Sequence, residues 1–214
     1  MGEIRAVIFD VGGVLTASPV TRVRTFERDT GLPHLALGPL FTGHDTAWSR
    51  FERSELSELD FVPEFEREAE ALGHRVDGRQ FLRDFFAEAG IREEMVAVVR
   101  HLRDGYRLGC ITNNVIREDR PEGSWTGTFD LAAMFDVVLE SAKVGLRKPD
   151  PRIYQLACDQ LGVAPAESVF LDDFGVNLKS ARALGMTTIR VDETPSAIEE
   201  LERVLGIPLP RHLG

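Results

Sequence analysis

The chain has 214 residues, of which 43% are hydrophobic and 28% charged, and its formal net charge is −10. This length fits one domain, or one domain with an inserted subdomain, and the acidic excess argues against nucleic acid or an anionic membrane as the main partner. No apolar run is long enough to span a bilayer and no signal-peptide pattern is present, so we expect a cytoplasmic protein.

The first predicted element is a strand over residues 4–9, where apolar and partly β-branched side chains are typical of a strand buried on both faces. It ends abruptly at Asp10, and Gly12 and Gly13 then predict a tight turn. Because ligands in open α/β sheets bind beyond the carboxyl ends of the strands, Asp10 is a candidate functional residue. On this stretch alone, an acidic side chain that caps a helix is an equally good interpretation.

Residues 17–91 contain no convincing strand and are predicted to form a helical subdomain. One helix begins near Ser57 and has an apolar stripe at helical spacing, with Pro63 either as a kink or as the start of the regular helix. The stripe consists of Phe61, Phe65, Ala69 and Leu72. A second helix is expected over residues 78–89.

From Glu93 onwards, predicted helices and strands alternate. The strands cover 106–112, 136–140, 168–171 and 187–191. The helices cover a segment that starts near Glu93 and ends before Gly105, and then 151–161, 177–184 and 194–205. Such alternation indicates a parallel sheet with helices on both faces. We therefore expect an α/β fold with a doubly wound parallel sheet in residues 1–16 and 92–214, and a small helical cap inserted at 17–91.

Three of the predicted strands end in polar residues, and parallel strands bring such ends to one edge of the sheet. The residues at these ends are Asp10, Thr112, Asn113, Asp172 and Asp173. Lys148 precedes a predicted helix and is within reach of the same edge. One site would then contain three carboxylates, a hydroxyl, an amide and an ammonium group.

Adjacent carboxylates at a buried strand end raise each other's pKa and are unfavourable unless a cation neutralises them. Capping of the following helix is the alternative role for Asp172 and Asp173. Carboxylate oxygens suit Mg²⁺, which typically retains water and binds one or two carboxylates together with a substrate phosphate. The pair therefore favours a Mg²⁺ site near Asp10.

Four segments of the chain resemble, in order, the motifs of the haloacid dehalogenase-like (HAD) hydrolases. They are Phe-Asp-Val-Gly-Gly-Val-Leu-Thr at 9–16, Thr-Asn-Asn at 112–114, Arg-Lys-Pro-Asp-Pro at 147–151 and Phe-Leu-Asp-Asp-Phe-Gly-Val-Asn-Leu at 170–178. The resemblance covers nearly the whole chain, and the phosphatase domain of soluble epoxide hydrolase and bacterial sugar-phosphate phosphatases are similar. It implies a Rossmann-type core, with residues 17–91 as the small helical cap.

The resemblance implies a phosphatase in which Asp10 attacks phosphorus and forms an aspartyl-phosphate that water then hydrolyses. Thr112 and Asn113 would hold the transferring phosphoryl oxygens, and Lys148 would neutralise charge on the phosphoryl group and the nucleophile. Asn177 would be a supporting polar contact to the substrate; the alternative is a polar residue early in a helix. The implied substrate is a small phosphorylated metabolite, a phosphate monoester, and the oligomeric state is left open.

Mg²⁺ is the cofactor that the resemblance implies. Asp10 and Asp173 would bind it with support from Asp172, and the backbone carbonyl of Gly12 would be a further ligand. Most HAD phosphatases have a second Asp at the position of Gly12, which protonates the leaving oxygen and then activates water, a contribution of roughly 10²–10⁴-fold. Metal binding should therefore persist, whereas proton transfer needs another group.

Two alternatives compete with the phosphatase interpretation. A metal-independent 2-haloacid dehalogenase also lacks the second Asp, because halide leaves without a proton, but it would not need Asp172 and Asp173. A HAD-like protein with weak or no catalysis is supported only by Gly12. For a phosphatase, a replacement acid would come from the cap or from Glu118 and Asp119.

The predicted cap would cover the site, exclude water during the first transfer and choose the substrate. Trp48, Phe51 and Glu52 are candidates for its pocket wall. For the two aromatic side chains, helix packing is the expected role.

Overall fold

The structure, a computed structural model, describes residues 3–87, 90–117 and 129–211. Its strands are β1 (Ala6–Phe9), β2 (Arg107–Thr112), β3 (Val137–Glu140), β4 (Ser168–Asp172) and β5 (Thr187–Arg190). They form a five-stranded parallel sheet with the order β3-β2-β1-β4-β5. Since β1 lies in the middle, its last residue Phe9 is level with Cys110 of β2 and Leu171 of β4.

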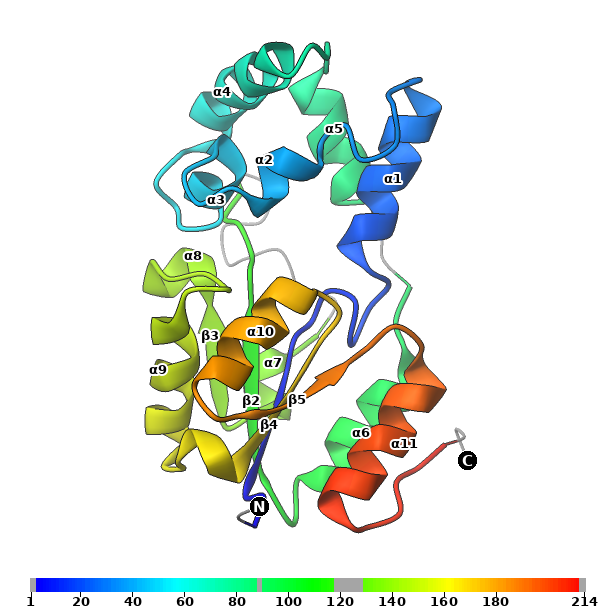
Figure 1. Ribbon diagram of the computed structural model, residues 1–214, viewed down its shortest axis with the longest axis vertical. Helices are drawn as coiled ribbons and strands as arrows, with labels where there is room; N and C mark the ends of the chain where they lie inside the picture. Colours follow the sequence, from blue (N-terminus) through cyan, green and yellow to red (C-terminus); the bar gives the residue numbers. More distant parts are fainter. Residues whose placement is uncertain (1–2, 88–89, 118–128, 212–214) are drawn as a thin grey trace.

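Helices cover both faces of this sheet (Figure 1). They are α6 (Glu93–Leu102), α9 (Pro151–Leu161), α10 (Gly175–Ala183) and α11 (Thr194–Leu205). Val7 and Phe9 pack with α6 and α11, whereas Ala6 and Ile8 pack with α9 and α10. Burial of both faces explains the continuous apolar sequence of β1 and confirms the doubly wound α/β fold.

Local signals in the sequence define the ends of several helices. Asp150 caps α9, because its Oδ1 accepts the N–H of Arg152 at 2.9 Å, and the left-handed Gly162 ends the helix. Gly206, also left-handed, follows the end of α11 as expected. α10 begins two residues earlier than predicted, because the Phe174 carbonyl already accepts the N–H groups of residues 177 and 178.

Shorter elements complete the connections between strands. They are α7 (Leu131–Met134), α8 (Ser141–Val144) and a 3-10 turn (Pro165–Glu167). Within the described ranges, no helix is long and apolar enough to cross a membrane.

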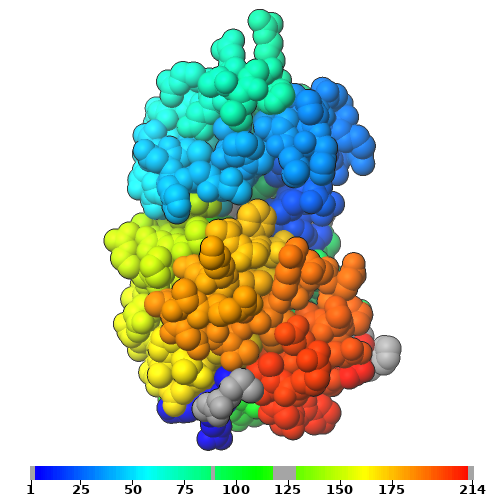
Figure 2. Space-filling view, viewed as in Figure 1, coloured from blue at the N-terminus to red at the C-terminus, as the bar shows by residue number. Residues whose placement is uncertain are grey.

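The helices described between residues 17 and 87 form a layer of their own, here called the cap. They are α1 (Pro19–Asp29), α2 (Gly38–Thr42), α3 (Ala47–Phe51), α4 (Glu58–Ala71) and α5 (Gly78–Phe85). Figure 1 places this layer beyond the end of the sheet towards which β1 runs, and Figure 2 shows it seated on the rest of the molecule. Its interior is aromatic: the Phe61 ring stacks on Phe51 and on Phe65, with ring centroids 4.6 and 5.1 Å apart.

Details of two cap helices differ from the prediction. Leu72 is not part of the buried stripe, since it follows α4 as its capping residue and is exposed. Pro63 lies inside α4, whose start is set by the Ser57 side chain. α5 ends at Phe85. The Arg22 guanidinium satisfies carbonyls at this helix end by donating hydrogen bonds to residues 85 and 87. The predicted end of this helix, at residues 88–89, lies outside the described residues.

The chain crosses between sheet and cap at two adjacent points. Thr16 and Ile91 form an isolated antiparallel bridge, and two backbone hydrogen bonds of 2.8 Å flank it, from Ala17 N–H to the Gly90 carbonyl and from residue 92 to residue 15. These crossings coincide with the boundaries that we propose for the cap, 16/17 and 91/92.

Candidate active site

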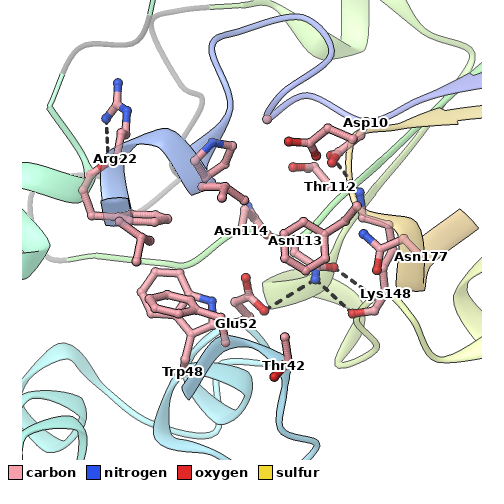
Figure 3. A pocket seen from close by; sticks show the side chains of 18 of the residues that line it. Asp10, Arg22, Thr42, Trp48, Glu52, Thr112, Asn113, Asn114, Lys148 and Asn177 are labelled. Atoms are coloured by element: carbon pink, nitrogen blue, oxygen red, sulfur yellow. Dashed lines mark hydrogen bonds and ion pairs between the residues drawn. The ribbon is translucent and has the colours of Figure 1, made fainter. Parts of the chain in front are cut away.

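The polar ends of three strands and one loop lysine meet at the edge of the sheet that faces the cap, and Figure 3 shows Asp10, Thr112 and Lys148 there. Asp10 follows β1, Thr112 ends β2 and Asp172 ends β4, so parallel pairing brings them to one edge. Lys148 arrives from the loop between α8 and α9. A single cavity is lined by Asp10, Gly12, Thr112, Asn113, Lys148, Asp173 and Asn177, and Asp172 is fully buried beside Lys148.

Lys148 is held as a buried cation. Its side chain is 1% exposed, and Nζ lies 2.8 Å from Asp10 Oδ1 and 2.8 Å from Asp172 Oδ2. Burial lowers the pKa of the ammonium group, but the two carboxylates more than offset this effect, so the pKa is raised and the lysine stays charged.

Asp10 presents one carboxylate oxygen to the cavity and uses the other for contacts. Oδ1 accepts hydrogen bonds from the Val11 N–H at 2.7 Å and from Lys148, whereas no group among the described residues donates to Oδ2. Burial raises the pKa of Asp10 well above its ordinary value; Lys148 counteracts this rise, and the neighbouring Asp172 and Asp173 add to it. The single positive charge of Lys148 is therefore not enough to keep the pKa of Asp10 at its ordinary value.

The donor set around Asp10 fits a hard divalent cation. One oxygen each of Asp10, Asp172 and Asp173 lies within 4.8 Å of the others, and all are carboxylate oxygens, as Mg²⁺ prefers. Burial also raises the pKa of Asp173, although its Oδ2 accepts a hydrogen bond from Ser18 Oγ. Three carboxylates next to one ammonium group leave an excess of negative charge that a cation would balance.

Gly13 makes room for Asp173. Its φ of +80° is in the left-handed region that favours glycine, and a Cβ at this position would lie 2.3 Å from the Asp173 Cγ. The second glycine of the turn is therefore required by both its backbone conformation and the close approach of the metal-ligand candidate.

Asp172 and Asn177 hold each other in place behind Lys148. Asn177 Nδ2 donates to both carboxylate oxygens of Asp172, at 3.1 and 3.0 Å, and the Phe174 N–H donates to Oδ1 at 2.7 Å. The Tyr154 hydroxyl in turn donates to the Asn177 carbonyl at 3.1 Å. The Asn177 amide thus supports Asp172, and Asp172 anchors the lysine.

The Asn113 side chain is also turned towards Lys148. Its Oδ1 accepts the Lys148 N–H at 2.9 Å, and its Nδ2 donates to the Lys148 carbonyl at 3.0 Å. Asn114 fixes the same turn from the other side by donating to Glu140 Oε1 at 2.7 Å. The motif at the end of β2 therefore secures the lysine loop as well as facing the cavity.

The cap forms the opposite wall of the cavity, whose volume is about 1770 Å³. Its lining is rich in aromatic side chains: Phe41, Trp48, Phe85 and Phe86. Trp48 fills both roles considered from the sequence, since it packs on Phe85 with ring centroids 4.7 Å apart and also lines the cavity. Phe51 is a packing residue within the cap.

Several groups at the site were not singled out from the sequence. Ser18 contacts Asp173, Arg147 pairs with Glu52, and Arg22 lines the far side of the cavity from Asp10 (Figure 3). The available signals were local: Ser18 precedes the first helical proline as a cap, and Arg147 adjoins Lys148. The predicted replacement acids at positions 118 and 119 lie outside the described residues.

The sequence matches the family model of haloacid dehalogenase-like hydrolases over residues 4–185. The chain belongs to this family. The match runs from β1 through the cap to the end of α10, so it includes every residue that we assign to the site.

Three relatives of this HAD-like hydrolase differ in length. The chain is 37% identical to Acyl-CoA dehydrogenase family member 10 from Mus musculus, over 98% of this chain and 20% of that protein. It is 35% identical to Bifunctional epoxide hydrolase 2 from Sus scrofa, over 96% of this chain and 40% of that protein, and so spans less than half of either relative. Phosphatase MT3486 from Mycobacterium tuberculosis is 33% identical, over 95% of this chain and 94% of that protein.

Further comparisons extend to structures and to a second reaction class. A HAD family enzyme from Bacteroides thetaiotaomicron, solved in complex with magnesium and inorganic phosphate, shares the fold with a TM-score of 0.61 and 20% identity, over 89% of this chain and 96% of that one. (S)-2-haloacid dehalogenase 1 from Pseudomonas sp. is 27% identical over 90% of this chain and 86% of that protein. The related proteins of this HAD-like hydrolase therefore include a phosphatase and a dehalogenase.

Proposed function

We propose that this HAD-like hydrolase is a Mg²⁺-dependent phosphatase that cleaves phosphate monoesters through an aspartyl-phosphate on Asp10. The main observation in support of this proposal is the cluster of Asp10, Asp172 and Asp173 around one lysine. A metal-independent dehalogenase would gain nothing from this excess of carboxylates, because it raises the pKa of the nucleophile and favours its unreactive protonated form. The cluster therefore supports a phosphatase over a dehalogenase.

The reaction that fits the geometry has two steps. First, an oxygen of Asp10 bonds to phosphorus while the bond from phosphorus to the ester oxygen breaks, and the leaving oxygen takes the electron pair and then a proton. Second, water attacks phosphorus, gives up a proton and displaces Asp10, which releases inorganic phosphate. Lys148, 2.8 Å from Asp10, would neutralise charge that develops on the phosphoryl oxygens, and Thr112 would hold them from the end of β2.

Asp10, Asp173 and the carbonyl of Gly12 are the residues that would hold Mg²⁺. The ion would supply positive charge that stabilises the phosphoryl oxygens. Asp172 would contribute mainly by anchoring Lys148, since its two oxygens already accept hydrogen bonds from three groups. Ser18 would orient Asp173 through its hydrogen bond to Oδ2.

The part of the cavity formed by the cap favours substrates whose organic group is apolar and of substantial size. Ligand pockets usually measure about 300–1,000 Å³, and this cavity is larger. Its aromatic side chains, such as Phe41, Trp48 and Phe86, provide apolar surface for an organic group, beside polar cap residues such as Arg22 and Glu27. We therefore propose apolar phosphate monoesters ahead of highly polar sugar phosphates.

The test is phosphate release from a panel of alkyl, aryl and sugar phosphates, measured with Mg²⁺ and with a chelator. We expect Mg²⁺-dependent turnover, loss of that turnover in Asp10→Asn, and a wild-type mass increase of one phosphoryl group after rapid acid quench. Chloride release from 2-chloropropionate without phosphate release would instead identify a dehalogenase.

A further inference from the structure

Glu52 is a buried carboxylate of the cap that contacts the core next to the proposed catalytic lysine. It directly follows α3, and its Oε2 accepts a hydrogen bond from Arg147 Nε at 2.6 Å. The two side chains are only 8% and 12% exposed, so this ion pair is shielded from water. Arg147 is the residue immediately before Lys148.

Asn113 connects the same carboxylate to the Lys148 backbone. Its Nδ2 lies 3.5 Å from Glu52 Oε2 and 3.0 Å from the Lys148 carbonyl, while its Oδ1 accepts the Lys148 N–H. In Figure 3 Asn113 lies between Glu52 and Lys148, and Lys148 reaches on to Asp10. The lysine loop is thus held at two consecutive positions, through the side chain of Arg147 and through the backbone of Lys148.

We propose that Glu52 is a positioning residue for phosphoryl transfer, which acts from the cap through Arg147 and Asn113 to place the Lys148 ammonium group against Asp10. The inference rests on the proposed phosphatase function. A lysine side chain has four rotatable bonds, so holding its ammonium group 2.8 Å from each of two carboxylates costs conformational entropy, and a fixed backbone lowers that cost. The lysine is then correctly placed only while the cap is seated on the core.

The physical basis is the charge of Arg147. Without the Glu52 carboxylate, its guanidinium would be buried without a counter-ion, which is strongly unfavourable. It would turn to solvent or towards the carboxylates of the site, and either movement would shift the adjoining Lys148. A neutral side chain at position 52 should therefore disturb the reaction even where the substrate does not touch the cap.

A second ion pair between cap and core provides a matched control. Arg117 Nε lies 3.1 Å from Glu58 Oε2, and these side chains are 12% and 27% exposed, but neither residue adjoins Lys148. Glu52→Gln and Glu58→Gln each remove one cap-to-core ion pair with little change of shape. Both variants would be assayed with acetyl phosphate, whose two-carbon acyl group offers little surface for contacts with the cap.

We expect Glu52→Gln to lower kcat for acetyl phosphate about 10–100-fold, with a much smaller change in KM, and Glu58→Gln to leave both parameters near those of the wild type. Adding Arg147→Ala to Glu52→Gln should reduce kcat little further, because both act on the same loop. Equal kcat in Glu52→Gln and Glu58→Gln would show that Glu52 is only a docking contact and would overturn the proposal.

Crystal structures of the two variants give a readout that does not depend on turnover. The contact between Lys148 Nζ and Asp10 should be lost in Glu52→Gln and kept in Glu58→Gln; its retention in both would refute the positioning role. Should Glu52→Gln not fold, Glu52→Asp keeps the charge but shortens the reach to Arg147, and the same loss of contact is expected. A wild-type protein without phosphatase activity would contradict the proposed function, while the lysine contact would still decide the role of Glu52.

Discussion

Replacement of Lys148 by methionine tests the electrostatic balance of the site. The ammonium group is buried and lies 2.8 Å from carboxylate oxygens of both Asp10 and Asp172. Methionine keeps most of the apolar stem but removes the charge, so two buried carboxylates lose their shared cation. Removing one partner of a buried ion pair typically destabilises a protein by about 3–5 kcal/mol, and we expect a loss of that size in the metal-free variant at neutral pH.

The loss of unfolding free energy caused by Lys148→Met should grow as pH rises. Burial already raises the pKa of Asp10, and without the ammonium group it would rise further in the native state, while its value in the unfolded chain stays near 4. A carboxyl group whose native pKa is raised contributes stability that is present below the unfolded pKa and lost as pH rises through the native pKa. If the native variant retains one extra proton, its deficit relative to wild type should increase by about 1.4 kcal/mol per pH unit, or about 3 kcal/mol between pH 5 and 7.

Urea unfolding in the presence of a chelator, at pH 5 and at pH 7, measures both quantities. Lys179→Met is the matched control: Lys179 is exposed on α10, so loss of its charge should change the free energy of unfolding by about 1 kcal/mol or less at either pH. A Lys148→Met deficit as small as that of the control, or one that is the same at both pH values, would refute the electrostatic account of the site.

Two further predictions concern the metal site. Gly13→Ala should displace Asp173 and lower the Mg²⁺ affinity, measured by calorimetry, at least about tenfold. Gly31→Ala is the control, because Gly31 has a similar φ of +73° but no atom within 4 Å of an added Cβ, so the Mg²⁺ affinity should not change. Equal affinities in the two variants would contradict the close approach at Gly13. Burial raises the pKa values of Asp10 and Asp173, so the contribution of these two groups to the stability of the metal-free protein should decline as pH rises above about 4. The increase in Tm caused by Mg²⁺ should grow over the same pH range, because the ion needs ionised ligands. A Mg²⁺ effect on Tm that is independent of pH would contradict this linkage.

Parallel topology is the reason why much of the site could be predicted from the sequence. Once helices and strands alternate, the strand ends must lie along one edge, and Asp10 and Asp172 are brought together without knowledge of side-chain packing. The helix caps at Asp150 and Gly206 are equally local and were predicted to within a residue or two. Lys148, which lies in a loop, needed the motif as well as the topology.

Side-chain partners over long sequence separations could not be predicted in this way. Asn113 and Asn177 carry amides that can face a ligand or a neighbouring chain segment, and the tertiary contacts decide between the two. Glu52 and Arg147 are 95 residues apart, and no periodicity or motif links them. Helix spacing likewise placed Leu72 on the buried stripe, whereas the end of α4 turns it into solvent.

Gly12 raises the question of how the leaving oxygen obtains a proton. Among the described residues, the glutamates that line the cavity are Glu27, Glu52 and Glu93. Glu27 accepts the N–H groups of residues 35 and 37, Glu52 is paired with Arg147, and Glu93 is an exposed residue in the first turn of α6. A phosphatase without a positioned acid should depend strongly on its leaving group, because a nitrophenolate can depart unprotonated and an alkoxide is far more basic. We therefore expect the wild type to cleave nitrophenyl phosphate much faster than an alkyl phosphate of similar size.

Gly12→Asp should reduce the difference in cleavage rate between nitrophenyl phosphate and the alkyl phosphate. The position lines the cavity and is not among the glycines with positive φ, so its backbone conformation is one that aspartate adopts readily. General acid catalysis contributes roughly 10²–10⁴-fold where a proton must be delivered, so kcat/KM for the alkyl ester should rise towards that range while the value for nitrophenyl phosphate changes little. A variant in which both esters gain equally would show that the new carboxylate acts on something other than the leaving oxygen. A variant in which neither ester gains would mean that the wild type already delivers this proton from another residue.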